Sequence, residues 1–357
     1  MVVTKSEMVA AIRKVASVIP KSSTIDALMG ALVKDGYLIA TNTEISVQVK
    51  LEAGAGEKFI LPTKALDMIC KLPDGDIRID VDDKDVITIS AGRIKNKIQT
   101  VPANQFAYDD IRDIGDERVV IDADKLVYAL SHVAFAADSK AQKIQMQGVY
   151  MQGDADKITM AALDGHKIAR MTIPSKGVAG MKIIVPKQAC EKLAALELRG
   201  DVELSYDQYA AVFKDEGCIV HTRLIGGVYF DYEKMFIDSQ IRTSLYRRDF
   251  SEALLRANTC INSEKSKVPV VIDITGHEME VSIVNITSDY HEVVQLSSDV
   301  AQPIRIGFNP KLIYDSLKFF SDEEVTVGLT SPKYPMFLSE ENTDMQVIIL
   351  PVAIQTN

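Results

Sequence analysis

Acidic residues gather at one place in this chain, the run from Asp80 to Asp85. Carboxylates this close together could hold a divalent cation, and a metal ion on Asp82, Asp83 and Asp85 could act on a nucleic acid. The run also lies between two segments with alternating apolar residues, 77–81 and 86–90, which predicts a hairpin turn. We expect the turn. The metal-dependent enzyme is an alternative that alanine replacement of the three aspartates would test.

Other constellations that carry chemistry are missing from the sequence. The chain has no phosphate-binding loop, no glycine-rich dinucleotide motif and no nucleophile elbow. It has five histidines, none paired at metal-ligand spacing: His132, His166, His221, His277 and His291. It has four cysteines without a Cys-x-x-Cys pair, expected to be mostly buried free thiols: Cys70, Cys190, Cys218 and Cys260. These observations predict no catalysis, no metal and no cofactor, and they favour a binding protein or a scaffold.

The composition is that of a globular protein with more than one core. Hydrophobic residues make up 47% and charged residues 25% of the 357 residues, and a chain of this length usually divides into domains. No run of 18 apolar residues is present, and the sequence opens on Lys5 and an amphipathic segment instead of a signal peptide. We therefore expect a cytoplasmic protein without a membrane partner.

The segments that must position any functional residue recur three times, about 124 residues apart. In each copy an apolar run ends at Pro62, Pro186 or Asn309, and an amphipathic helix and an alternating strand follow. A second helical phrase precedes this one in every copy. A period this long fits a complete domain better than a solenoid repeat, so the sequence predicts three α+β domains with two helices each. The expected domains are residues 1–116, 117–241 and 242–357.

Charge is divided unevenly between these segments. The formal net charge is −10, which by itself disfavours a nucleic-acid binder. The six helical phrases, however, contain 14 Lys or Arg residues against 9 Asp or Glu residues. An acidic body with mildly basic helices can hold a polyanion on one face, although solvated helix surfaces would give the same count. With no Trp and 6% aromatic residues, stacking of single-stranded bases is not indicated.

One stretch, residues 158–169, is more specific than the rest. Two alternating segments meet there at Asp164-Gly165, a strong hairpin signal, and His166 follows. With four further phrases in order, the chain resembles the bacterial DNA polymerase III beta subunits, the sliding clamps. The further phrases are residues 184–187, 222–232, 307–310 and 348–352. The resemblance covers essentially the whole chain.

The resemblance implies both a fold class and a function. Each domain would pack two helices on antiparallel sheet, and two copies would join head to tail in a six-domain ring around double-stranded DNA. Helices would line the hole and hold phosphates without reading the bases. The ring would be a processivity factor without catalysis, bound to the replicative DNA polymerase, an ATP-driven clamp loader and other clients. The DNA-facing residues would be Arg13, Lys14, Lys21, Lys64, Lys71, Lys192, Arg247 and Lys318.

Two further sites follow from the resemblance, carried over position by position. Clients would insert a short extended peptide with apolar anchors into a cleft beside the second and third domains. The cleft residues would be Lys143, Met146, Leu163, Gly165, His166, Lys167, Ile168, Phe230, Lys234, Met235, Ile348, Ile349, Leu350, Pro351 and Val352. The joint between two copies would contain Phe106, Cys260 and Ile261. Phe106 could equally complete the core of its own domain.

Several cleft positions depart from the family pattern. Phe230 stands where proline is usual and Leu163 where threonine is usual, while Lys143 and Lys167 stand where arginine is common. Lysine lacks the planar fork of arginine, so the preferred client peptide could differ. A scaffold that keeps the fold but no longer surrounds DNA is a second alternative, which neutralising several helix lysines would distinguish from a clamp.

Overall fold

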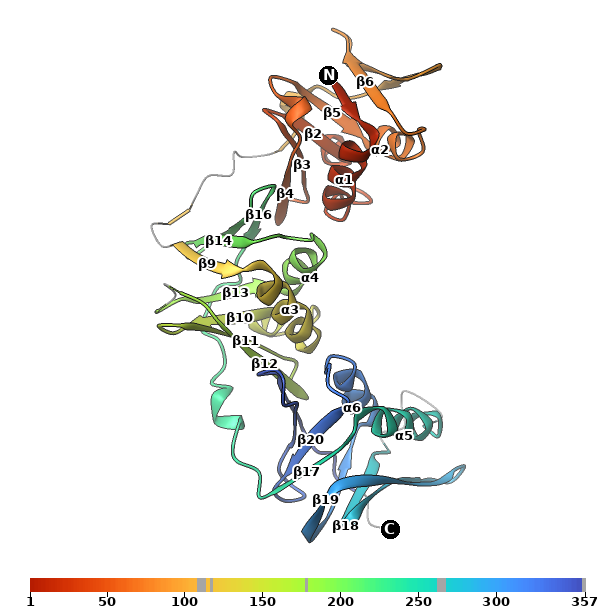
Figure 1. The fold of residues 1–357 in the computed structure, drawn as a ribbon, viewed down its shortest axis with the longest axis vertical. Helices are drawn as coiled ribbons and strands as arrows, with labels where there is room; N and C mark the ends of the chain where they lie inside the picture. The colour runs from red at the N-terminus through yellow and green to blue at the C-terminus, as the bar shows by residue number, and fades with distance from the viewer. Residues whose placement is uncertain (108–113, 116–117, 177–178, 262–267, 355–357) are drawn as a thin grey trace. The chain divides into compact units, whose positions relative to one another are not determined.

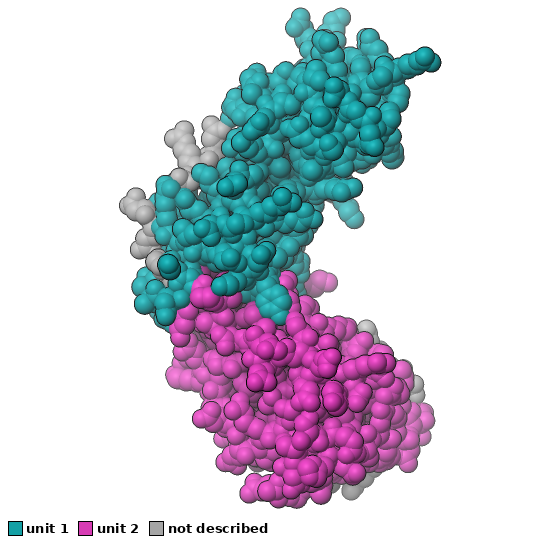
Figure 2. All heavy atoms as spheres, viewed as in Figure 1, with its two compact units in different colours: residues 1–130, 154–156, 175–226 teal, residues 131–153, 157–174, 227–357 magenta. Residues whose placement is uncertain are grey.

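The computed structural model describes residues 1–107, 114–115, 118–176, 179–261 and 268–354. The chain forms two compact units, drawn in two colours in Figure 2. The first unit contains residues 1–130, 154–156 and 175–226, and the second contains residues 131–153, 157–174 and 227–357.

Short antiparallel strands and amphipathic helices make up the first unit (Figure 1). Its first repeat contains β1 (Val2–Thr4), α1 (Lys5–Ala16), β2 (Gly30–Lys34), β3 (Tyr37–Thr41), β4 (Ile45–Lys50), β5 (Lys58–Pro62), α2 (Thr63–Cys70), β6 (Asp76–Val81), β7 (Val86–Ala91) and β8 (Ile94–Gln99). From the second repeat it contains β9 (Arg118–Asp122), most of α3 (Ala123–Val133), β13 (Lys182–Pro186), α4 (Lys187–Ala195), β14 (Asp201–Tyr206), β15 (Ala210–Lys214) and β16 (Cys218–Arg223). The strands form an eight-stranded sheet, β5-β2-β3-β4-β16-β15-β14-β9, and a four-stranded sheet, β1-β6-β7-β8.

The second unit is built from the same kinds of element. It contains β10 (Gly148–Gly153), β11 (Lys157–Leu163), β12 (Lys167–Pro174), β17 (Ile241–Tyr246), α5 (Arg247–Thr259), β18 (Val270–Val284), β19 (Asp289–Phe308), α6 (Pro310–Leu317), β20 (Glu324–Leu329), β21 (Met336–Ser339) and β22 (Gln346–Ile349). Within this unit the strand order is β10-β11-β12-β22-β21-β20-β17, and β18 and β19 form a long hairpin.

Local sequence explains where the helices begin and which face they bury. The Thr4 hydroxyl accepts a hydrogen bond from the Glu7 amide at 3.3 Å, which satisfies one of the free amides at the start of α1. Asn309 caps α6 in the same way, and Pro310 occupies the first turn, where a missing N–H costs nothing. In α1 the apolar residues spaced by three and four, such as Met8 and Ile12, are buried.

The same strand contact joins successive repeats inside each unit. In the first unit β4 pairs with β16, the last strand of the second repeat, and Val47 lies opposite Val220. In the second unit β12 pairs with β22, the last strand of the third repeat, and Ala169 lies opposite Val347. Hydrogen-bonded sheet therefore continues across both of these joints between repeats.

A side-chain turn precedes the joining strand in the same way three times. The Asn42 Oδ1 atom accepts from the amides two and three residues later, at 3.1 and 2.8 Å. Asp164 does the same at 2.9 and 3.0 Å, and Asn285 does so at 2.9 Å twice. Because this turn fixes where the next strand begins, the start of β19 corresponds to the starts of β4 and β12.

The predicted organisation into three α+β domains with two helices each is confirmed: α1 and α2, α3 and α4, and α5 and α6 belong to successive repeats. The exact domain boundaries stay predictions. The boundary between residues 116 and 117 lies outside the described residues, and β17 begins at Ile241, one residue before the second boundary.

The expectation of buried thiols is correct for two of the four cysteines. Cys190 and Cys218 are buried, and burial raises the pKa of Cys218 to about 12. Cys260 is partly buried, and Cys70 at the end of α2 is exposed, contrary to the prediction. Among the helices of the described residues, none combines the length and apolar character needed to cross a membrane.

Candidate functional site

The aspartate run forms the predicted turn between β6 and β7. Asp82 accepts hydrogen bonds from the amides of Val86 and Lys84, at 3.0 and 2.9 Å, and these bonds lower its pKa. Asp85 takes a positive φ of 56°, a conformation that Asp tolerates in tight turns. Within the described ranges, no three His, Cys, Asp or Glu side chains lie together where they could hold a metal ion. The carboxylates therefore close a hairpin.

The Asp164-Gly165 hairpin builds one side of the expected cleft. Asp164 forms the side-chain turn described above, and its carboxylate also pairs with the Lys167 ammonium. Gly165 has a φ of +87°, which an L side chain rarely adopts, so glycine is required there by the turn. The hairpin leaves His166 exposed beside the partly buried Lys167.

The strand β22 brings the C-terminal cleft residues to this hairpin. Ile168 lies opposite Ile348 and Lys167 lies opposite Ile349 in the β12–β22 pair. The Leu350 amide donates to the carbonyl of His166 at 2.9 Å, so the pairing continues past the end of β22. Segments about 180 positions apart in the sequence are thereby held in contact.

An aromatic cluster positions the third group of cleft residues. The Tyr229 ring stacks on Tyr150 with centroids 4.7 Å apart, and its hydroxyl donates to the carbonyl of Ala161 at 3.4 Å. This anchors the segment that carries Phe230, over whose ring the Lys143 ammonium lies at 5.3 Å. The burial of Tyr229 raises its pKa far above the usual range for a phenol. Phe230 and Lys143 therefore form one corner of the site.

The predicted cleft residues divide into a buried group, here called the floor, and an accessible group, here called the rim. The floor consists of Leu163, Ile168, Ile348 and Ile349. All four are buried, so their side chains contribute to the hydrophobic core as well as to the floor. Partly or fully exposed apolar residues are Met146, Phe230, Met235, Leu350, Pro351 and Val352. Lys234 is exposed and pairs with Asp231, outside the apolar rim. The rim is therefore the part that a client side chain could contact.

The predicted DNA-facing cations fall into two groups. Arg247 donates from Nε to the Asp322 carbonyl at 2.8 Å, and Lys318 pairs with Asp315 at 2.7 Å, which raises the Lys318 pKa. Six others have no ion pair with another described residue: Arg13, Lys14, Lys21, Lys64, Lys71 and Lys192. Arg13 and Lys14 border a hollow of about 570 Å³ beside α1. The unpaired group is the better candidate for phosphate contact.

Phe106 lies in the core of its own domain. Its side chain is 7% exposed and packs with Leu28, Leu32, Ile39 and Ile60. Cys260 and Ile261 follow α5 and are partly buried, and the Asn285 side chain donates to the Cys260 carbonyl at 3.0 Å. Phe106 belongs to the first unit and these two residues belong to the second, and the joint between copies stays a prediction.

Replacement of Phe106 by alanine is expected to destabilise the N-terminal domain. Loss of a buried phenyl ring costs about 3 kcal/mol or more, because the transfer free energy is lost and a cavity remains. Urea denaturation of the Phe106→Ala protein should show an early transition, and Ile261→Ala should shift it much less. Equal stability of both variants would contradict the assignment of Phe106 to the core.

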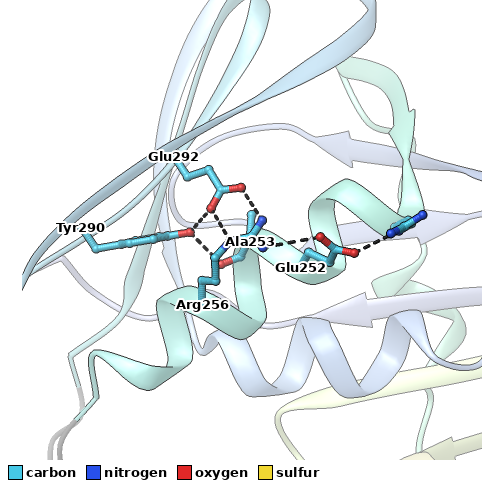
Figure 3. A network of polar contacts seen from close by, with 6 residues as sticks. Glu252, Ala253, Arg256, Tyr290 and Glu292 are labelled. Atoms are coloured by element: carbon cyan, nitrogen blue, oxygen red, sulfur yellow. Dashed lines mark hydrogen bonds and ion pairs between the residues drawn. The ribbon is translucent and has the colours of Figure 1, made fainter.

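An ion-pair network that the sequence did not reveal joins α5 to β19 (Figure 3). The Arg256 guanidinium binds both carboxylate oxygens of Glu292, at 2.8 and 2.6 Å, and reaches Glu252 at 3.4 Å. The Tyr290 hydroxyl donates to the carbonyl of Ala253 at 3.1 Å and contacts Glu292. The Arg256 bonds lower the pKa of Glu292, while burial and the carboxylate raise that of Tyr290 to about 12. The network fixes the first part of β19 on the helix.

Comparisons with known proteins agree along the chain. Models of the N-terminal, central and C-terminal domains of the DNA polymerase III beta subunit match residues 1–109, 120–231 and 238–353. The beta sliding clamp of Pseudomonas putida is 23% identical over 355 residues, covering 95% of this chain and 96% of its own. That of Synechocystis sp. is 22% identical over 360 residues, covering 92% of each chain.

Solved structures give the same fold. The beta subunit from the DNA polymerase of Streptococcus pyogenes superposes with a TM-score of 0.91 at 18% identity, covering 98% of this chain and 99% of that one. A sliding clamp from Pseudomonas aeruginosa bound to griselimycin gives 0.91 at 20% identity, covering 99% of each chain. From three matching domains in order, similar relatives and a common fold, this chain belongs to the DNA polymerase III beta-subunit family, the sliding clamps.

Proposed function

We propose that this chain closes into a ring with a second copy of itself, surrounds double-stranded DNA, and tethers a polymerase and other clients through the cleft around Ile168 and Leu350. Membership of the family makes it a non-catalytic polymerase subunit, a processivity factor. A ring stays on DNA because the two are linked, so tight binding is unnecessary and would slow sliding. Opening the ring would need a separate ATP-driven loader.

The repeated joint is the observation that carries the ring. Two joints are made inside the chain, β4 with β16 and β12 with β22. Two strands that correspond to these joint strands remain. One is β8, the last strand of the first repeat, which corresponds to β16 and β22, and the other is the first part of β19, which corresponds to β4 and β12. In the described part of the chain, β8 pairs only with β7, and residues 289–295 pair only with β18. Two copies joined by β8 and β19 would satisfy both edges and leave no end open.

The internal joints also predict the register of the third. Val47 and Ala169 stand five positions after their turn residues, and Tyr290 stands five positions after Asn285. On the partner strand of the joint, Asn96 of β8 corresponds to Val220 of β16. Asn96 lies opposite Ile89 of β7, just as Val220 lies opposite Phe213 of β15. This places Asn96 opposite Tyr290 of the second copy.

The charges of the two edges are complementary in this register. Lys97 would lie opposite Asp289 and Lys95 opposite His291, and both lysines are exposed. Asp289 and Glu280 already hold His291 between them, so this edge of β19 is acidic. Opposite charges facing each other across antiparallel strands favour pairing and disfavour association of like edges.

Binding of a client peptide tests the cleft directly. A peptide of the Gln-Leu-x-Leu-Phe type, titrated into the protein in a calorimeter, is expected to bind on the order of micromolar. Combined replacement of Met146 and Leu350 by alanine removes two rim side chains and should abolish the measurable heat. Ile286→Ala serves as the control, because this apolar side chain is fully exposed at the β18–β19 turn.

Two results would reject the cleft. One is absence of binding to a wild-type protein whose circular dichroism shows that it is folded. The other is unchanged binding by the Met146→Ala, Leu350→Ala protein. The first result would favour a scaffold that keeps the clamp fold without its clients, and the second would assign peptide binding to another surface.

A further inference from the structure

Arg170 lies on the same strand as the cleft floor but was not among the predicted cleft residues. It is three positions after Lys167 on β12 and pairs with Gln346, next to the pair of Ile168 with Ile348. Side chains two positions apart on a strand share a face, so Arg170 follows Ile168 on the same side of the sheet. The cleft floor therefore continues to a charged group.

The contacts of Arg170 hold its guanidinium without neutralising it. Nε donates to the Gln346 side-chain oxygen at 2.6 Å, and the guanidinium carbon lies 3.7 Å from the centre of the Phe236 ring. The side chain is partly buried, and this burial lowers the pKa of Arg170 although the nearby Tyr232 and Glu233 oppose the shift. No carboxylate of the described residues lies within ion-pair distance of it. Its terminal N–H groups remain for another acceptor.

A half-buried arginine that has no ion-pair partner and lies beside apolar surface lowers the stability of the folded protein unless an anion binds it. Desolvation of a charge is unfavourable when no partner compensates for it, and stacking on one ring offsets only part of that cost. A guanidinium with free terminal nitrogens matches a carboxylate, which it can bind with two parallel hydrogen bonds. A carboxylate group of a bound ligand would therefore supply the partner for the Arg170 guanidinium.

The segment around Phe236 indicates which carboxylate can reach Arg170. The Phe236 ring covers the guanidinium and packs edge-on against Tyr232 and Phe337, with centroids 6.3 and 6.1 Å away. Phe236 therefore covers one face of the guanidinium and is itself held by two further rings. A terminal carboxylate needs no room for a following residue beside these rings, which favours a chain end over a carboxylate within a continuing chain.

We propose that Arg170 binds the C-terminal carboxylate of a client peptide whose apolar anchors occupy the cleft. The proposal rests on the peptide-binding function proposed above and adds a preference for clients that present a free chain end. Ile168 and Ile348 contribute apolar floor, and Arg170 contributes the charge that fixes the end of the peptide. Clients with an internal peptide would bind without this contribution.

Paired peptides test the proposal. Fluorescence anisotropy would compare one N-terminally labelled peptide as the C-terminal acid, as the C-terminal amide, and as the amide with one added glutamate. Wild-type protein should bind the acid on the order of ten-fold more tightly than the amide. Arg170→Met should bind the acid as weakly as wild type binds the amide and leave amide binding unchanged. Arg242→Met, the same substitution at an exposed arginine on β17, should retain the full preference.

Each other outcome overturns the proposal in a recognisable way. Equal affinity of wild type for acid and amide would remove the chain-end preference while leaving the cleft intact. Equal weakening of both peptides by Arg170→Met would mean that Arg170 only supports Phe236 and the cleft. A glutamate-extended amide that binds like the acid would assign the site to an acidic side chain. Failure of both the acid and the amide to bind wild type would reject the cleft itself.

Discussion

Changing Lys95 and Lys97 to glutamate is expected to convert the proposed dimer into monomers. Both side chains are exposed on the free edge of β8, and the register of the internal joints places them against the acidic start of β19. Like charges facing each other across a strand pair oppose association, in addition to the loss of the attraction between Lys97 and Asp289. Light scattering behind size exclusion should then show a mass near the 39.4 kDa of one chain.

A charge exchange separates the proposed register from a general effect of charge. Lys97→Asp and Asp289→Lys should each weaken the dimer, and the chain that carries both should recover it, because every joint of a homodimer then contains the reversed pair. Lys333→Glu, on an exposed loop of the second unit, should leave the dimer intact. Monomers from the doubly exchanged chain would show that Lys97 and Asp289 do not face each other.

Phe106 is unsuitable for this experiment even though it was predicted as a joint residue. A charge placed on a side chain buried among Leu28, Leu32, Ile39 and Ile60 would unfold the domain, and monomers would then carry no information about the joint. The edge lysines avoid this problem because they are solvent-exposed and their substitution leaves the core unchanged.

Neutralising Arg13, Lys14, Lys64 and Lys71 together is expected to lower processive DNA synthesis several-fold. These cations have no ion pair with another described residue, so their charge is available to phosphates. Each lost phosphate contact should also reduce the slope of log affinity against log salt by up to about 0.9. Primer extension on a long template and duplex-binding assays at several salt concentrations would measure both effects.

The control for this experiment is Lys318→Gln. Lys318 was predicted to face DNA together with the other cations. Its ammonium pairs with Asp315 and lies 4.3 Å from the centre of the Tyr314 ring, so little of its charge is free. We expect a small effect on synthesis and on the salt slope. Processive synthesis that is unaffected by the four-fold substitution would contradict a DNA-facing role for these helices and support the scaffold alternative.

Local patterns account for the parts of the fold that could be predicted. The turn at Asp82 follows from an Asp that accepts neighbouring amides between two alternating strands, and the Asp164-Gly165 hairpin follows from a positive φ that glycine allows. Both depend on residues a few positions apart, and periodicity placed the helices for the same reason.

Residue roles that depend on distant contacts could not be predicted in this way. Arg256 corresponds in the repeat to Lys14, yet Glu292, from a strand 36 positions away, binds it. The sequence likewise predicted that Lys318 is a solvent-accessible helix cation. In the structure its ammonium pairs with Asp315 and lies over the Tyr314 ring. A charge count treats all such cations alike, because it contains no information about their partners.

By itself the sequence determined the three-fold repeat, the two helices in each copy and the hairpin turns, because hydrophobic periodicity and turn chemistry are local properties. Family resemblance added the identity of the clamp domains. Only the tertiary structure decided that Phe106 belongs to a core, that no carboxylate of the described residues forms an ion pair with Arg170, and that β8 and the start of β19 each have one free edge among those residues. Strand pairing, burial and charge compensation arise between segments far apart in the chain, and their free energies depend on three-dimensional neighbours that no local pattern specifies.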